Sequence, residues 1–160
     1  MACLRNVIII SLSGLAFSCC PDGWRKGKNS CYFISPGNAT WSQASNICRA
    51  FNGELAVIND AAENALLGRI ITNIKGAFKK DFWIDGSDAV TEGIWYWAST
   101  MENFGYTNWG IGEPNNQGEV EDCVEFYLLD FVWNDDHCNT LNHFICEKEL
   151  SSSLAGELIG

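Results

Sequence analysis

Residues 112–138 read GEPNNQGEVEDCVEFYLLDFVWNDDHC, and acidic and amide side chains dominate both ends of this stretch. The much longer range 84–146, which includes it, holds neither Lys nor Arg. Proteins bind calcium through about six to eight oxygen atoms from carboxylates, amide carbonyls and the main chain. The stretch is therefore a candidate calcium site, although composition alone is equally compatible with acids and amides that simply populate solvated loops.

The chain as a whole has the size and composition of one exported domain. With 160 residues and 47% hydrophobic composition, it can bury one core and is too short for two ordinary domains. We expect residues 1–18 to be a signal peptide, because the apolar run 7–17 follows Arg5 and includes small residues that suit a signal peptidase. Residues 19–148 then form the domain, and residues 149–160 form a flexible tail without a motif.

Secretion and the net charge exclude several classes of partner. No segment is long and apolar enough for a membrane span, so we expect a secreted, extracellular protein. A formal net charge of -10 argues against nucleic acid as a partner. The same acidity is compatible with simple solubility or with a supply of oxygen ligands for calcium.

Eight cysteines in an exported chain of this size predict disulfide bonds, because export leads to oxidising surroundings. Removal of residues 1–18 also removes Cys3 and leaves an odd number, so one cysteine lacks an internal partner. The sequence alone does not choose among the possible pairings of the rest. Cys19 is the expected spare, which predicts a disulfide-linked homodimer. Asn38 begins an N-glycosylation sequon, a site that is often left unoccupied in the secretory pathway.

Hydrophobic spacing predicts two helices, followed by strands. Thr40 to Gln43 has the form of a helix capping box, and apolar residues recur at helical spacing up to Asn52-Gly53. Asp60 and Glu63 start a second amphipathic helix that continues to Gly76. Short strands are expected around 31–34, 55–58, 82–84, 95–97, 124–129, 131–133 and 143–146.

Distinctive residues occur in a definite order along the range 20–148. They are Cys20-Pro21, Trp24, Trp41, Ala44, Cys48, Leu55-Ala56, Ile58, Trp83-Ile84, Asn108-Trp109, Gly112 to Asn116, Glu121-Asp122-Cys123, Trp133-Asn134-Asp135, Cys138 and Phe144 to Glu147. In this order the chain resembles the C-type lectin domain family. The resemblance implies an α+β fold, in which two helices accompany antiparallel sheets and a long calcium-binding loop. It also implies the disulfides Cys20–Cys31, Cys48–Cys146 and Cys123–Cys138.

The resemblance implies a calcium site that binds sugar. In the family the sugar coordinates the calcium through two neighbouring hydroxyls, and the metal ligands also exchange hydrogen bonds with those hydroxyls. The metal and carbohydrate ligands fall on Glu113, Asn115, Glu121, Asn134 and Asp135, each with an oxygen-bearing side chain. A cis peptide bond at Pro114 would turn the flanking side chains toward one ion, whereas an ordinary trans loop proline is the alternative.

The pair Glu113 and Asn115 bears on the choice of sugar. In the family this pair goes with mannose, fucose or N-acetylglucosamine, whereas galactose binders usually carry Gln and Asp. We therefore expect terminal mannose-type sugars as partners, for example in the recognition of microbial glycans in innate immunity. Galactose binding stays open, because some invertebrate members with the Glu-Pro-Asn pattern bind galactose.

A second, auxiliary calcium site is implied by the same resemblance. Its ligands fall on Asp88, Glu92, Asn116, Glu121 and Asp122. Asn116 replaces a common aspartate, and the lost charge should weaken this site. The chain also reads Trp83-Ile84-Asp85-Gly86 where the family often has Trp-Ile-Gly-Leu, which places a carboxylate at a usually apolar strand end.

The aromatic residues are expected to be core residues and not platforms for sugar. This applies to Trp24, Trp41, Trp83, Trp95, Trp97 and Trp109, and Trp133 is likewise expected to be structural. No enzyme is predicted, because the chain has no zinc-protease, nucleophile-elbow or phosphate-loop motif. His137 and His143 have no matching partner pattern. The rival to a lectin is a matrix, mineral-binding or ice-binding protein on the same fold, which an acidic chain also suits.

Overall fold

The computed structural model describes residues 17–18, 20–74, 78–150 and 152–153, and it confirms an α+β fold with two helices. The helices are α1 (Trp41–Ala50) and α2 (Ala61–Asn73), and a short 3-10 turn, η1, covers Gln117–Glu119. The strands are β1 (Phe17–Ser18), β2 (Arg25–Lys26), β3 (Ser30–Ile34), β4 (Glu54–Leu55), β5 (Phe82–Ser87), β6 (Tyr96–Trp97), β7 (Glu102–Asn103), β8 (Cys123–Phe126), β9 (Trp133–Asp136), β10 (His143–Glu149) and β11 (Ser152–Ser153).

The capping residues start both helices where the sequence predicts. The Thr40 side chain accepts a hydrogen bond from the Gln43 amide, and the Gln43 side chain accepts one from the Thr40 amide. Asp60 caps α2 by accepting from the amide of Glu63 at 2.8 Å. These bonds satisfy amides that have no partner within the first turn of a helix. Both helix starts are therefore confirmed.

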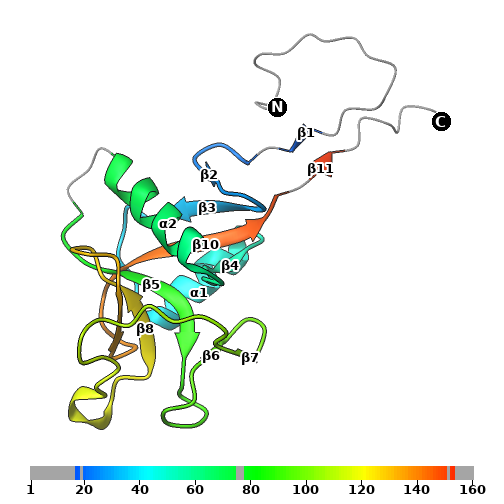
Figure 1. Cartoon of the computed structure of the whole chain (residues 1–160). Coiled ribbons are helices and arrows are strands. Elements are labelled where there is room, and N and C mark those ends of the chain that lie inside the picture. Colours follow the sequence, from blue (N-terminus) through cyan, green and yellow to red (C-terminus); the bar gives the residue numbers. More distant parts are fainter. Residues whose placement is uncertain (1–16, 19, 75–77, 151, 154–160) are drawn as a thin grey trace, which may run out of the picture.

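Strand β10 lies inside the larger sheet, between β3 and β5 (Figure 1). It pairs antiparallel with β3 and β4, but parallel with β5, where His143 lies opposite Phe82. This parallel pair adds to the antiparallel sheets that the resemblance implies, and the sheet is mixed. Residues 88–142 separate the two strands in the sequence, which leaves ample chain for the crossover that a parallel pair requires. The pairs β5–β8 and β8–β9 are antiparallel. The long loop between β7 and β8, which holds several expected calcium ligands, leads into β8.

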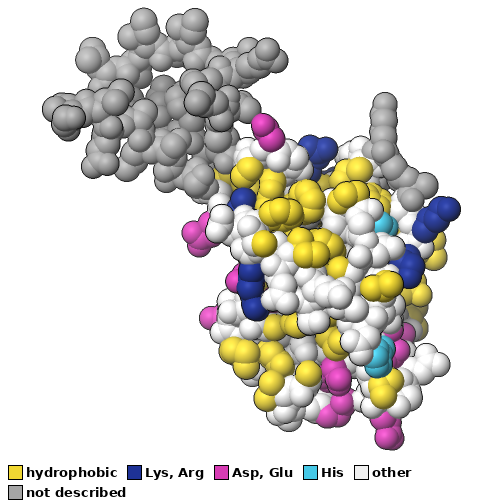
Figure 2. Space-filling model, turned by 180° about the vertical axis from the view of Figure 1, so that it is seen from behind, with side chains coloured by type: hydrophobic (Ala, Val, Ile, Leu, Met, Phe, Trp, Pro, Cys, Tyr) yellow, Lys and Arg dark blue, Asp and Glu magenta, His cyan; other side chains and the backbone are white. Residues whose placement is uncertain are grey.

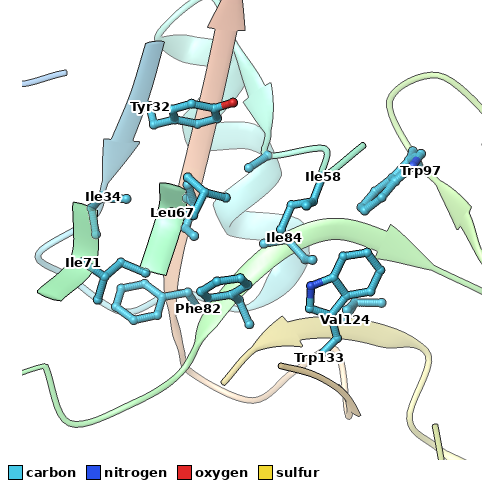
Figure 3. Packing of buried hydrophobic residues seen from close by; sticks show 13 residues of the cluster. Tyr32, Ile34, Ile58, Leu67, Ile71, Phe82, Ile84, Trp97, Val124 and Trp133 are labelled. Atoms are coloured by element: carbon cyan, nitrogen blue, oxygen red, sulfur yellow. The ribbon is translucent and has the colours of Figure 1, made fainter. Parts of the chain in front are cut away.

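The main core lies between α2 and the strands β5, β8 and β9. Leu67 and Ile71 of α2 pack in one cluster with Phe82, Ile84 and Trp133, all of them buried (Figure 3). Trp83 and Trp97 are also buried, and the remaining tryptophans of the expected core set are partly buried against a cluster: Trp24, Trp41, Trp95 and Trp109. The prediction that the tryptophans belong to the core is confirmed.

Three disulfides join the pairs that the resemblance implies. Cys20–Cys31 closes the N-terminal hairpin, Cys48–Cys146 ties α1 to β10, and Cys123–Cys138 ties the start of β8 to the segment after β9. The described residues include no free cysteine. Cys19, the expected intermolecular cysteine, lies outside the described residues.

The ends of the expected domain lie close to two short strands. β1 pairs with β11 through Phe17–Ser153 and Ser18–Ser152, and β10 extends to Glu149, one residue into the expected tail. Most of the expected signal peptide and the tail beyond Ser153 lie outside the described residues. Within the described part of the chain, no helix is long and apolar enough to cross a membrane.

Asp85 is buried in β5 without disturbing the fold. Only 1% of it is exposed, and its Oδ2 accepts a hydrogen bond from the amide of Ser99 at 2.8 Å. Its own backbone amide and carbonyl pair with Ala56 and Ala98. Burial raises the pKa of the carboxyl to about 6, although the bonds from Ser99 oppose the rise. The departure from the family pattern is therefore absorbed by local hydrogen bonds.

Candidate metal centre

The loop before η1 is held against β9 by the carboxylate of Asp135. This side chain is fully buried, and its two oxygens accept hydrogen bonds from the backbone amides of Asn115 at 3.0 Å and Asn116 at 2.7 Å. The amide of Gly110 adds a bond to the carbonyl of Trp133 at 2.8 Å. The Glu113–Pro114 peptide bond is cis, which is the first of the two alternatives that the sequence leaves open at Pro114. Two segments some twenty residues apart in the sequence, 113–116 and 133–135, thus meet at one place.

The expected ligands of the sugar-binding site are Glu113, Asn115, Glu121, Asn134 and Asp135, called here the principal group. Asn115 Nδ2 donates to Glu113 Oε2 at 2.5 Å, so these two side chains lie on the same side of the loop. Glu121 Oε2 accepts from the amide of Gln117 at 2.8 Å. The amide nitrogen of Asn134 donates to the carboxyl of Glu125, which is also outside the group, at 2.8 Å.

The carboxylates of the principal group repel one another. The pKa of Glu113 is raised, first by partial burial and then by its hydrogen bond and charge interaction with Asp135. The pKa of Glu121 is also raised, first by partial burial and further by the charges of Asp135 and Asp136. A divalent cation among these oxygens would favour their ionised forms and reverse both effects. The chemistry of the group therefore fits a hard cation such as calcium.

A second acidic group, called here the auxiliary cluster, consists of Asp88, Glu92 and Asp122. Their carboxylate oxygens lie within 4.8 Å of one another. Asp88 is 1% exposed, and its Oδ1 has no hydrogen-bond partner, whereas its Oδ2 accepts from the amide of Gly93 at 2.8 Å. The pKa of Asp88 is raised by burial and then by the charges of Glu92 and Asp122. A buried carboxylate oxygen without a donor fits a cation ligand.

Two residues expected in the auxiliary site, Asn116 and Glu121, are not members of the auxiliary cluster and bond to each other. Asn116 Oδ1 accepts a hydrogen bond from the amide of Glu121 at 3.1 Å, and the backbone of Asn116 has a φ of 42°. Asn tolerates this left-handed conformation better than most residues. Asn116 thus shapes the turn before Glu121. Among the described residues, the acidic side chains that converge at the auxiliary site are the three of the auxiliary cluster.

Acidic side chains dominate the end of the molecule that carries these loops. Figure 2 shows Lys and Arg over the upper and middle parts of one face, and Asp and Glu without them at its lower end. This distribution agrees with the absence of Lys and Arg from residues 84–146. The two acidic groups are therefore little neutralised by basic side chains.

Sequence reasoning missed the buried polar contacts that fix β9 beneath the site. Trp133 Nε1 donates to Asn64 Oδ1 at 2.8 Å, and Asn64 Nδ2 donates to the carbonyl of Phe131 at 2.9 Å. Glu125, which is 4% exposed, accepts from Asn134 and from Asn142 Nδ2 at 2.6 Å. Burial raises the pKa of Glu125 to about 8 despite both donors. The one signal in the sequence is a charged residue, Glu125, inside the strand expected at 124–129.

The two histidines contact neighbouring residues, and the sequon asparagine lies at the surface. His143 is 7% exposed, packs against Phe78 and Phe82, and has Nδ1 at 3.2 Å from the carbonyl of Gly37. His137 Nδ1 accepts from the amide of Asn139 at 3.2 Å. Asn38 is exposed. Both histidines are thus engaged in local structure.

Comparisons with known proteins identify the fold and its relatives. The family model of the lectin C-type domain matches residues 37–148. Perlucin from Haliotis laevigata is 36% identical over 132 residues, covering 81% of this chain and 83% of that protein. The galactose-specific lectin nattectin from Thalassophryne nattereri is 33% identical over 135 residues, covering 84% of each. The carbohydrate-recognition domain of the mouse scavenger receptor C-type lectin superimposes with a TM-score of 0.76 at 29% identity, covering 83% of this chain and 100% of that one.

The matched family model spans more than half of the chain, and the curated relatives extend the match over most of its length. The three disulfides and the mixed sheet around β10 agree with that match. The family is one of carbohydrate-recognition domains and is generally non-enzymatic. The chain belongs to the C-type lectin domain family.

Proposed function

We propose that the chain binds terminal sugars through a calcium ion held by the principal group, with a preference for mannose, fucose or N-acetylglucosamine. Glu113, Asn115, Glu121, Asn134 and Asp135 would hold the ion. The bound ion supplies a positive centre for two neighbouring sugar hydroxyls. The same carboxylates accept hydrogen bonds from those hydroxyls, and the amide of Asn115 donates one.

The main support for this proposal is that both carboxylate oxygens of Asp135 accept hydrogen bonds from backbone amides. Its buried carboxylate holds the amides of Asn115 and Asn116, so residues 113–116 are positioned before any ion arrives. Each oxygen of a carboxylate has a second lone pair, which leaves capacity for a cation. A preorganised set of oxygen atoms loses less entropy on binding than a flexible loop does. The arrangement therefore supports calcium binding at this place.

The choice of sugar rests on Glu113 and Asn115. Their side chains contact each other at 2.5 Å and present a carboxylate and an amide together. By family resemblance this pair favours mannose-type sugars. Nattectin, described as a galactose-specific lectin, favours galactose as the second candidate. Competition between the two sugars distinguishes the candidates.

The site is exposed, which limits the affinity of a single domain. Asn115 is exposed and Glu113 is only partly buried. We expect a dissociation constant of about a millimolar for one sugar, or roughly 4 kcal/mol of binding free energy. Useful binding then requires several sites in one particle, and a disulfide dimer through Cys19 would supply two. We expect the protein to be secreted and to carry a glycan at Asn38. With several sites in one particle, it would recognise microbial glycans.

A mannose matrix tests the proposal. The wild-type protein should bind in calcium, elute with a chelator, and elute with free mannose at lower concentration than with galactose. Glu113→Gln should abolish retention, because it removes a charged ligand. Glu119→Gln is the matched control: Glu119 is an exposed acid in the same loop, outside the principal group, and its variant should behave as wild type. Retention that survives the chelator would refute the calcium-dependent mechanism, and retention only on mineral would support a matrix protein.

A further inference from the structure

Glu125 is a buried acid next to an expected calcium ligand. It lies in β8, where all four residues are buried, and it is 4% exposed. The antiparallel register places it directly opposite Asn134 of β9. Burying a charged side chain costs free energy unless partners compensate it, so its partners indicate its role.

Two amide groups are the partners of this carboxylate in the described part of the chain. Oε1 accepts from Asn134 Nδ2 at 2.8 Å, and Oε2 accepts from Asn142 Nδ2 at 2.6 Å. Each asparagine turns its NH₂ group toward a different oxygen of Glu125, and both of these oxygens are the acceptors. The carbonyl oxygen of each amide then points away from Glu125.

This constraint matters at Asn134, because a calcium ligand must present its carbonyl oxygen and not its NH₂ group. Rotation of the amide by a half turn would place Oδ1 of Asn134 against the oxygen of Glu125, where the two repel. We propose that Glu125 is a positioning residue for the sugar-binding calcium site and keeps Oδ1 of Asn134 directed away from β8 as a ligand. This inference rests on the proposed function of the principal group.

Asn142 provides a matched control. It is 3% exposed, and its backbone is held independently of Glu125, because its amide and carbonyl both pair with Ala39. Asn142→Ala removes one hydrogen bond of Glu125 and leaves the bond to Asn134. Glu125→Met removes both bonds and fills the space with an unbranched apolar side chain. The two variants therefore disturb the same buried network but differ at Asn134.

Calcium titration by calorimetry, without sugar, tests the inference on the full chain. Glu125→Met should weaken calcium binding by about 10-fold or more, as is usual when a group that orients a metal ligand is lost. Asn142→Ala should lose a similar amount of thermal stability and keep calcium affinity within about 2-fold of wild type. Equal calcium affinity in wild type and Glu125→Met would overturn the inference, and so would equal weakening in both variants.

The side-chain amide of Asn134 gives a second readout that needs no calcium. In the metal-free wild type, its NMR signals should show an NH₂ group held by a carboxylate, and the Asn142→Ala variant should keep them. Glu125→Gln, the nearest isostere, serves if Glu125→Met fails to fold, and it should shift these signals because it has one carbonyl oxygen for two amides. Signals unchanged by loss of Glu125 would overturn the positioning role. A wild type that shows these signals but binds no calcium would refute the proposed function and not the orientation of Asn134.

Discussion

The two acidic groups differ in how the protein balances their charge. In the principal group, both oxygens of Asp135 and one of Glu121 accept backbone amides. In the auxiliary cluster, Asp88 Oδ1 is buried without a partner, and the nearest charges are the carboxylates of Glu92 and Asp122. The protein itself therefore holds the principal group in shape, whereas the auxiliary cluster, among the described residues, leaves one buried carboxylate oxygen without a donor. The difference predicts that calcium completes the first group and stabilises the second.

The largest expected effect follows from breaking the principal group at its anchor. Asp135→Asn places an NH₂ group against one of the two amides that the carboxylate now accepts. The unpaired buried donor should cost about 1–3 kcal/mol of unfolding free energy. Sugar retention should be lost, because a ligand charge and the loop anchor disappear together. Urea unfolding and a mannose column measure the two effects.

Asp136→Asn is the control for this change, because Asp136 is the next residue of β9 and is partly exposed. It should keep most of the sugar binding. An Asp135→Asn variant that still bound sugar in calcium would contradict the anchoring role of Asp135.

The next effect concerns the auxiliary cluster, where one substitution should change the free energy of unfolding in opposite directions without and with calcium. Without metal, Asp88→Asn removes repulsion from Glu92 and Asp122, so it should raise the free energy of unfolding by about 1 kcal/mol, or roughly 2–4 °C in Tm. In calcium the same variant should be less stable than wild type, because it lacks a charged ligand. Thermal unfolding with chelator and with calcium measures both. Asp130→Asn, at an exposed acid, should change neither by more than about 0.5 kcal/mol, and a shift of equal sign in both conditions would contradict a cation at Asp88.

The raised pKa values of Glu113 and Glu121 predict sensitivity to acid. Calcium binds the ionised carboxylates, so protons compete with it, and binding is lost as the pH falls through the raised pKa values. The loss should begin above the ordinary glutamate pKa of about 4.3. Retention on a mannose column, followed from pH 7.5 to pH 4 with circular dichroism to check the fold, measures this. Binding at about pH 4 equal to that at neutral pH would refute a calcium-bridged mechanism.

The smallest expected effect is a change in calcium affinity on substitution of Asn116, which the family resemblance places in the auxiliary site. Asn116→Asp adds a carboxylate at a position whose side chain can still accept the hydrogen bond from the amide of Glu121, the residue before Asp122. We expect calcium affinity at the auxiliary cluster to rise by only a few-fold, about 1 kcal/mol or less, and stability in chelator to fall slightly. Calorimetric titration resolves this change. A fall in calcium affinity would show that position 116 shapes the turn and does not approach the ion.

Local signals in the sequence predicted the helices well. The capping box at Thr40 and the cap at Asp60 act within one turn, so four residues suffice to locate each helix start. The disulfides and the ligand sets came from resemblance alone, because many pairings of the cysteines are compatible with the sequence. The family order of residues therefore supplied the long-range information that spacing lacks.

The contacts that the sequence did not predict join distant positions. Trp133 binds Asn64 across 69 positions, and Asn142 binds Glu125 across 17. No periodic pattern marks an asparagine as the partner of one particular buried side chain. The parallel pair of β5 and β10 was missed for a related reason, since short strands carry no signal of direction. Glu125, one of these partners, also accepts a hydrogen bond from Asn134, an expected ligand of the site.

Calcium titration with and without methyl α-mannoside is the decisive test of whether one group of residues binds both the ion and the sugar. If the ion and the sugar share the principal group, each must tighten the binding of the other by the same factor, because binding free energies are linked. A shared group predicts a higher calcium affinity in the presence of the mannoside and no heat of mannoside binding in chelator. Mannoside binding that is equal with and without calcium would contradict it.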